Sequence, residues 1–318
     1  MSTDHTFSIY GHPNIYNDYS ARKLNIYFSE PDKGVKEDTG IVLLIPGFGA
    51  NANSNVYKKM RSVFADKYNL IAVQCDYFGW EFMQSQALSE SRANFNDMGI
   101  MQALDNITAV TALEQIIIDN ALRYNSGKMI IYGHSHGAYL AYLCNIFAPD
   151  LFSMIIDNSA WLYPVYIDYS RQLYSADGSV TTFDYFAREV IEDREILNLK
   201  SIYKKYNNTC SILSFHGAHD NLISLSKKQE FCDLISSCEL HQVHNGNLND
   251  IFKSSGHGLN ADFLLMFDYV MKKHNKEFAF KEASDVTNQN IETNMFSYVV
   301  DYTHKLPFLT LQKRHGLN

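Results

Sequence analysis

The sequence has no apolar run long enough to span a membrane, since no stretch approaches the roughly 18 unbroken apolar residues that a transmembrane helix needs. Its first residues, Met1 to His5, lack the basic and apolar regions of a secretory signal. The chain also has no internal repeat and no low-complexity tract. We therefore expect a cytoplasmic protein without a membrane span or a repeat architecture.

Cysteines are few and positive charge is not in excess. The five cysteines are an odd number without metal-like spacing, and Cys144 and Cys210 sit in apolar runs, which predicts reduced core residues.

With 27 Lys and Arg against 35 Asp and Glu, the net charge is −8. This balance argues against a surface that binds nucleic acid or an anionic membrane. It leaves the oligomeric state open.

Four histidines near the C-terminal half of the chain raise the question of a metal site. They occupy alternating positions without an obvious carboxylate or thiolate partner, so we expect no metal; they are His216, His219, His241 and His244. We expect no organic cofactor either.

What the 318-residue chain does contain is a regular alternation of apolar strands and amphipathic helices. The alternation predicts an α/β fold with a mostly parallel central sheet and helices on both faces. Two alternating strands before Ile41 are expected to form an antiparallel edge. The segment from Met295 to Leu311 alternates like a hairpin, and Pro307 restricts its second half to an edge strand. Expected inner strands cover residues 41–45, 69–75, 129–132, 152–158 and 210–215, and expected helices cover 51–67, 100–124, 224–236 and 259–274.

Between residues 159 and 208 this alternation stops, and aromatic residues are interleaved with arginines. We interpret this segment as a helical cap inserted into a single core made of residues 1–158 and 209–318. Trp161, Tyr163 and Tyr185 are candidate substrate contacts, although packing is the commoner role of such side chains.

The stretch from Met129 to Gly137 predicts a buried strand that runs into a Gly-x-Ser-x-Gly turn and then a helix. Such a turn holds Ser135 in strained backbone geometry and exposes its hydroxyl. A Cβ atom at Gly133 or Gly137 would clash with the neighbouring strand or helix. The unpaired N–H groups of the following helix favour negative charge at the turn. Ser135 is therefore the candidate nucleophile.

A serine nucleophile needs a base and a carboxylate that orients the base. Asp220 directly follows a strand, and His257 lies between two glycines before a helix. Asp157, one strand earlier, is the competing acid. His134 and His136 flank the nucleophile, and we expect their side chains to pack rather than react.

The Gly-x-Ser-x-Gly elbow, the order Ser, Asp, His and the strand alternation resemble the α/β-hydrolase superfamily between about Gly40 and His274. The resemblance implies that Ser135 is the nucleophile, Asp220 the orienting acid and His257 the base. It also implies that the turn from Gly47 to Gly49 brings the backbone N–H of Phe48 beside that of His136 to form an oxyanion hole. Many relatives carry a histidine where this chain has Pro46.

The activity implied by the resemblance is that of a serine hydrolase, most simply an esterase, which forms an acyl-enzyme on a small-molecule ester or an acylated glycan. Two alternatives stay open. One is an acyltransferase that uses the same triad on a glycan hydroxyl, because Gly133 to Leu140 and Ile156 to Ser159 also look like bacterial hydrolase-like proteins linked to surface-glycan modification. The other is a non-catalytic binding protein on a hydrolase fold.

Overall fold

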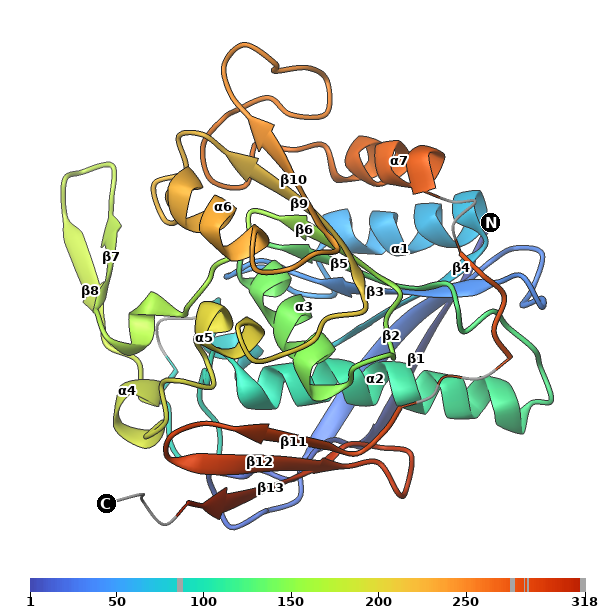
Figure 1. The fold of residues 1–318 in the computed structure, drawn as a ribbon, viewed down its shortest axis with the longest axis horizontal. Helices are drawn as coiled ribbons and strands as arrows, with labels where there is room; N and C mark the ends of the chain where they lie inside the picture. The colour runs from blue at the N-terminus through green and yellow to red at the C-terminus, as the bar shows by residue number, and fades with distance from the viewer. Residues whose placement is uncertain (85–87, 275–277, 283, 285, 315–318) are drawn as a thin grey trace.

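The computed structural model describes residues 1–84, 88–274, 278–282, 284 and 286–314. Its centre is an eight-stranded sheet in the order β1-β2-β4-β3-β5-β6-β9-β10 (Figure 1). The six strands from β4 to β10 in this order run parallel, and β1 and β2 form the expected antiparallel edge. The strands of this sheet are β1 (Thr3–Tyr10), β2 (Lys23–Glu30), β3 (Gly40–Ile45), β4 (Leu70–Cys75), β5 (Met129–His134), β6 (Met154–Asn158), β9 (Ser211–Gly217) and β10 (Cys238–Val243).

Helices cover both faces of this sheet, as predicted (Figure 1). One face packs against α1 (Asn55–Tyr68) and α7 (Phe263–His274), and the other against α2 (Ile100–Asp119), α3 (His136–Phe147) and α6 (Leu225–Cys232). All twelve residues of α3 are buried, because this helix lies between the sheet and α2. Within the described ranges, no helix is both long and apolar enough to cross a membrane.

Some helices are shorter than the apolar pattern predicts, for local reasons. The first begins at Asn55 rather than Asn51, because the Asn51 side chain accepts a hydrogen bond from the N–H of Asn53 and holds a turn instead. The helix from Ile100 ends at Asp119 rather than Tyr124. There Ala121 is left-handed (φ 54°), and Leu122 donates its N–H to the carbonyl of Ile117 at 3.0 Å.

The insertion between β6 and β9 is more varied than the helical cap that the sequence predicts. It contains an antiparallel hairpin, which projects from the side of the molecule (Figure 1). A tight turn at Asp177 and Gly178 (φ 83°) closes this hairpin. The elements of the insertion are η2 (Val165–Ile167), β7 (Arg171–Tyr174), β8 (Val180–Phe183), α4 (Ala187–Val190) and α5 (Leu199–Tyr203), and a further short helix, η1 (Trp80–Met83), lies earlier in the chain.

The C-terminal segment forms a separate three-stranded sheet beside α2 (Figure 1). Its last two strands are the predicted hairpin, with the strand after Pro307 at an edge. This sheet is hydrogen-bonded to the insertion between β6 and β9. Asp193 of the insertion is buried and accepts hydrogen bonds from Thr293 Oγ1 at 2.5 Å and Tyr298 Oη at 3.0 Å. The strands are β11 (Gln289–Glu292), β12 (Phe296–Asp301) and β13 (Phe308–Lys313).

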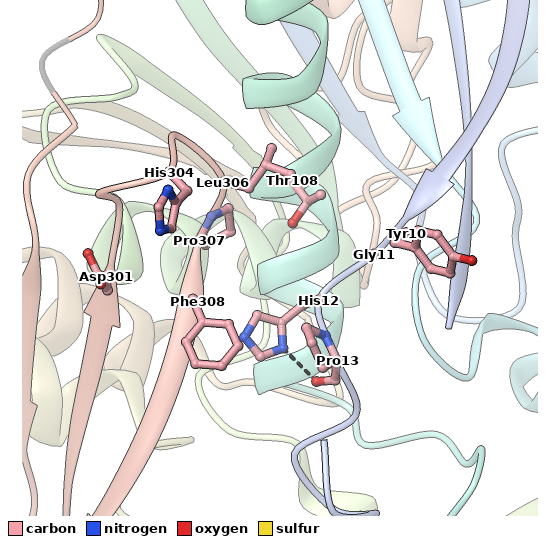
Figure 2. Close-up of a pocket in the computed structure, with 10 residues that line it drawn as sticks. All are labelled: Tyr10, Gly11, His12, Pro13, Thr108, Asp301, His304, Leu306, Pro307 and Phe308. Atoms are coloured by element: carbon pink, nitrogen blue, oxygen red, sulfur yellow. Dashed lines mark hydrogen bonds between the residues drawn. The ribbon is translucent and has the colours of Figure 1, made fainter. Parts of the chain in front are cut away.

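His12 joins this small sheet to the N-terminal part of the chain, at a hollow of about 530 Å³ that holds none of the candidate catalytic residues (Figure 2). Its Nδ1 donates to the carbonyl of Pro13 at 2.7 Å, and its Nε2 accepts from the N–H of Leu309 at 2.8 Å. The second bond needs the neutral ring, because a protonated Nε2 cannot accept. Burial lowers the pKa of His12 to about 4, so the ring is neutral at pH 7.

We therefore expect His12 to make stability depend on pH. The pKa of His12 is about 4 in the folded chain against 6.5 for a free histidine, so the unfolded chain takes up the proton first as the pH falls below 6.5. The stabilisation that the neutral His12 ring provides is therefore complete above pH 6.5 and is lost as the pH falls toward 4. His12→Gln should be less stable than the native protein at pH 7, and this difference in unfolding free energy should shrink at acid pH. Urea unfolding across this range measures it, with His5→Gln on β1 as the control; a constant difference would contradict the assignment.

Candidate active site

Ser135 lies at the tip of a tight turn between β5 and α3. Its backbone has a positive φ (φ 54°, ψ −115°), which is a strained conformation for a residue with a Cβ atom. The N–H of Ser135 donates to the carbonyl of Asn158 on β6 at 2.7 Å, and its own carbonyl accepts from Ala138 and Tyr139 of α3 at 3.1 Å. The strained turn is thus fixed on both sides.

The two glycines of this turn are required by space, as the sequence predicts. A Cβ atom at Gly133 would lie 2.4 Å from the Cα of Ala138 in α3, and one at Gly137 would lie 2.1 Å from the carbonyl oxygen of Ile45 in β3. Real Cβ atoms do not approach backbone atoms so closely, so α3 can pack against β5 and β3 only with glycine at both positions.

The structure brings three predicted site residues together in a hydrogen-bonded chain. Ser135 Oγ lies 2.7 Å from Nε2 of His257, and Nδ1 of the same ring lies 2.8 Å from Oδ2 of Asp220. The serine is 6% exposed and the aspartate 8%. The ring is placed so that one nitrogen can take the serine proton while the other donates to the carboxylate.

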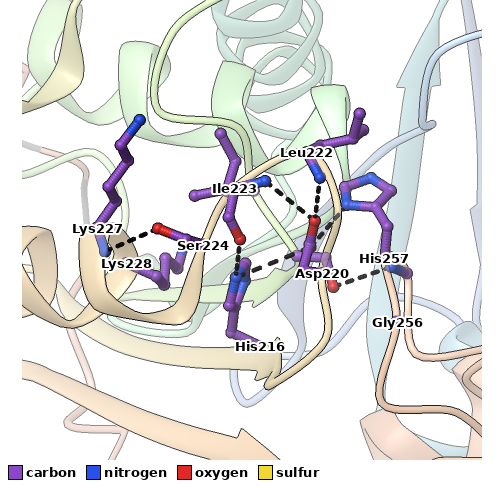
Figure 3. Close-up of polar contacts among 12 residues, drawn as sticks. His216, Asp220, Leu222, Ile223, Ser224, Lys227, Lys228, Gly256 and His257 are labelled. Atoms are coloured by element: carbon purple, nitrogen blue, oxygen red, sulfur yellow. Dashed lines mark hydrogen bonds and ion pairs between the residues drawn. The ribbon is translucent and has the colours of Figure 1, made fainter.

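Asp220 is held by its own loop as well as by the histidine (Figure 3). Its Oδ1 accepts hydrogen bonds from the N–H of Leu222 at 2.8 Å and of Ile223 at 3.0 Å. Burial by itself would raise the pKa of Asp220, but the hydrogen bond and charge of His257 together with these two N–H groups lower it below its usual value. The carboxylate is therefore ionised at neutral pH and can orient the ring.

Gly217 allows this loop to bend, because a Cβ atom there would lie 2.2 Å from the carbonyl oxygen of Ser255. The N–H of His219 donates to the same carbonyl at 2.8 Å. The loop that carries Asp220 is thus packed directly on the loop that carries His257.

Asp157, the competing acid, is used elsewhere in the core. Its Oδ2 bonds the ammonium group of Lys228 at 2.5 Å, the hydroxyl of Tyr142 at 2.8 Å and that of Ser214 at 2.9 Å. Both side chains of the ion pair are completely buried. Burial disfavours the ammonium form, yet Asp157 raises the pKa of Lys228 above its usual value. Lys228 could not be recognised from sequence, because a lysine in the polar segment Leu225 to Glu230 gives no sign of burial.

The two histidines that flank the nucleophile pack, as predicted. His134 lies against the ring of Phe263, with centroids 5.0 Å apart, and burial lowers its pKa to about 4. His136 is fully buried against Trp161 at 5.1 Å, and burial lowers its pKa to about 3. Both rings are therefore neutral at pH 7.

Phe48 lies at the centre of an aromatic cluster beside the elbow. Its ring contacts those of His136 and Trp161, each at 5.6 Å between centroids, and those of Tyr166 at 5.7 Å and Tyr185 at 5.9 Å. The turn before it is tight, since a Cβ atom at Gly47 would lie 2.6 Å from Nδ1 of His134, and Gly49 has a φ of 87°.

Of the three insertion residues chosen from sequence, Trp161 and Tyr185 belong to this cluster, and Tyr163 does not. Tyr163 lines a separate hollow with Asp168 and Arg194. Arg171 is one of the arginines interleaved with these aromatic residues, and the sequence analysis assigned it no role; its guanidinium carbon lies 4.8 Å from the centroid of the Phe48 ring.

The four histidines considered for a metal have different surroundings. His216 bonds the carbonyl of Ile223 at 2.8 Å, and His219 bonds Ser255 Oγ at 2.9 Å. His241 stacks on Phe215, and His244 accepts from the N–H of Gly246. In the parts of the chain that the structure describes, no three His, Cys, Asp or Glu side chains are grouped as metal ligands would be.

Solved structures with the same architecture align with most of the chain. Est1E from Butyrivibrio proteoclasticus, solved with bound ferulic acid, is 17% identical over 80% of this chain and 95% of its own, with a TM-score of 0.53. The peroxisomal alpha-beta-hydrolase Lpx1 from Saccharomyces cerevisiae is 15% identical over 90% of this chain and 92% of its own, with a TM-score of 0.55. The chain has an α/β-hydrolase fold. This confirms the fold that the sequence predicts.

A third such structure is Thermogutta terrifontis esterase 2 phosphonylated by sarin, which is 15% identical over 83% of this chain and 92% of its own, with a TM-score of 0.51. A family model described as a protein of unknown function (DUF2920) matches residues 81–188, a stretch of this α/β-hydrolase fold that includes Ser135. None of the curated proteins matches the chain.

Proposed function

We propose that the protein is a serine hydrolase that cleaves a carboxylic ester through an acyl-enzyme at Ser135. The observation that carries the proposal is the hydrogen-bonded chain from Ser135 Oγ through His257 to Asp220, with distances of 2.7 and 2.8 Å. This is the arrangement that activates a serine hydroxyl, because each proton donor already faces its acceptor.

In the proposed reaction, Nε2 of His257 takes the proton of Ser135 as Oγ attacks the ester carbonyl carbon. Asp220 stabilises the resulting imidazolium, since its carboxylate is ionised and bonded to Nδ1. The carbonyl oxygen becomes an oxyanion, for which the backbone N–H groups of Phe48 and His136 are the proposed donors. The imidazolium then protonates the leaving alcohol, and water, deprotonated by the same ring, releases the acid.

The position of His136 supports its part in this proposal. It is the first residue of α3, so its N–H has no acceptor within the helix and faces the turn at the positive end of the helix dipole. A fully buried, neutral imidazole side chain leaves only the backbone N–H of this residue for the reaction.

Labelling with a fluorophosphonate tests the proposal directly. We expect a single modification at Ser135, and Ser135→Ala should remove it while the circular dichroism spectrum and unfolding midpoint change little. Sarin modifies a protein of the same fold, Thermogutta terrifontis esterase 2, so the reagent class is suitable. Ser170→Ala, which removes a hydroxyl bonded to Asp184 in the insertion, is the control. Labelling that persists in Ser135→Ala would refute the assignment, and an unlabelled native protein would favour a non-catalytic role.

A further inference from the structure

Arg171, the first residue of β7, places a positive charge beside the candidate active site. Its guanidinium carbon lies 4.8 Å from the centroid of the Phe48 ring and 5.8 Å from that of Tyr166. Phe48 is also the residue whose backbone N–H is the proposed oxyanion donor. A group bound by Arg171 would therefore lie beside the side chain of Phe48.

The hydrogen-bonding capacity of Arg171 is almost unused. Its one hydrogen bond in the described chain runs from Nη1 to the hydroxyl of Tyr185, at a long 3.3 Å, and none of the described carboxylates lies within ion-pair distance. A guanidinium has five N–H donors. The neighbouring arginines differ: Arg188 pairs with Asp184 at 2.8 Å, and Arg194 donates to the carbonyl of Arg188 at 2.9 Å.

Arg171 and Tyr185 line a cavity of about 320 Å³ with mixed polar and apolar walls; the apolar part includes Met83 and Phe183, and Ser135 and His257 are not among the lining residues. Two carboxylates also line it, and both are engaged. Glu90 accepts from the N–H groups of Phe186 and Asn96, each at 2.8 Å, and Asp184 is bonded to Ser170 and Arg188. Arg171 is therefore the one cation among the residues that line this cavity, and none of the described carboxylates is paired with it.

We propose that Arg171 binds a carboxylate carried by the substrate, so that the enzyme acts on esters of acidic compounds. This inference rests on the proposed hydrolase function. A planar guanidinium pairs with a carboxylate through two parallel hydrogen bonds, and the guanidinium of Arg171 lies over the rings of Phe48 and Tyr166. A phosphate dianion is a poorer fit, because its second charge would meet Glu90 and Asp184 without a second free cation.

Two matched pairs of esters test this, one for each side of the ester bond. The first pair is 4-acetoxybenzoate and its methyl ester, and the second is 4-nitrophenyl hydrogen succinate and 4-nitrophenyl methyl succinate. For at least one pair, Arg171→Met should lower the ratio of kcat/KM for the charged ester to kcat/KM for the neutral ester by roughly 10- to 100-fold, because a charge-assisted bidentate contact is lost. Most of this change should appear as a higher KM for the charged ester. Arg171→Lys should recover part of it. Arg123→Met, which removes an exposed arginine paired with Glu37 and Glu282, is the control for net charge.

A binding measurement separates failure of this inference from failure of the proposed function. In the Ser135→Ala background, calorimetry compares 4-hydroxybenzoate with methyl 4-hydroxybenzoate, and methyl hydrogen succinate with dimethyl succinate. It should show a preference for the two carboxylates that Arg171→Met removes. If that preference is present but no ester is cleaved and Ser135 is not labelled, the carboxylate site stands and the hydrolase proposal falls. If esters are cleaved but neither pair is discriminated through Arg171, the carboxylate site is refuted while the hydrolase stands.

Discussion

Asp220→Asn should lower kcat by about 10⁴-fold, because the amide would select the wrong tautomer of His257. In the native protein Oδ1 of Asp220 accepts from the N–H groups of Leu222 and Ile223, and Oδ2 accepts from Nδ1 of His257. An asparagine oxygen can keep the two backbone bonds, which leaves its NH₂ group facing Nδ1. The ring would then carry its proton on Nε2, where it cannot accept the proton of Ser135.

The measurement is steady-state hydrolysis of a simple ester, with active sites counted by fluorophosphonate titration. The unfolding midpoint should change little, since the backbone bonds are kept. Asp262→Asn is a matched control: this aspartate also accepts backbone N–H groups, those of Leu264 and Leu265, at the start of α7. A loss of less than about tenfold in Asp220→Asn would show that another group orients the base.

Asp157→Asn should act on stability instead, lowering the free energy of unfolding by about 3 to 5 kcal/mol. The substitution leaves the ammonium group of Lys228, which is completely buried, without its counter-charge. Lys228→Met should have a loss of similar size, because it leaves a buried carboxylate unpaired. The double variant should lose clearly less than the sum of the two, since neither charge then remains in the core.

Chemical denaturation of the four proteins gives this coupling. Turnover per titrated site in the folded Asp157→Asn protein should stay far above that of Asp220→Asn. If Asp157→Asn were stable and inactive, the orienting acid would be Asp157, and the ion pair with Lys228 would have another purpose.

The parts of the site that were predictable from sequence are those that short stretches encode. The strand, the turn with Gly133 and Gly137, and the helix after Ser135 follow one another along the chain, so their order alone fixes where the hydroxyl points. The alternation of strands and helices predicted the parallel sheet for the same reason. His257 between two glycines could be chosen because its loop follows the last inner strands.

The sequence favoured Asp220 over Asp157 as the acid but left Asp157 as a competitor, because Asp157 lies near the end of β6, Asp220 follows β9, and these parallel strands are direct neighbours in the sheet. The two aspartates differ in that Asp157 is paired with Lys228, which lies 71 positions later in the chain. The helical segment that contains Lys228 is polar in sequence, so the pairing could not be predicted. The hairpin of β7 and β8 was not predicted, because its two strands have only four residues each and a pattern so short does not stand out among the neighbouring aromatic residues. Asp177 and Gly178 at its turn were a usable signal.

The C-terminal sheet has a consequence for the order in which the protein can fold. The insertion is tied through Asp193 to Thr293, 100 residues later, and His12 is bonded to Leu309 across 297 residues. Contacts so far apart in the chain form slowly, and during synthesis they cannot form before the later partner has left the ribosome. The central sheet, whose last strand ends at Val243, can assemble earlier. We therefore expect the aromatic cluster over Ser135 to become fixed in a late step of folding, after the elbow itself.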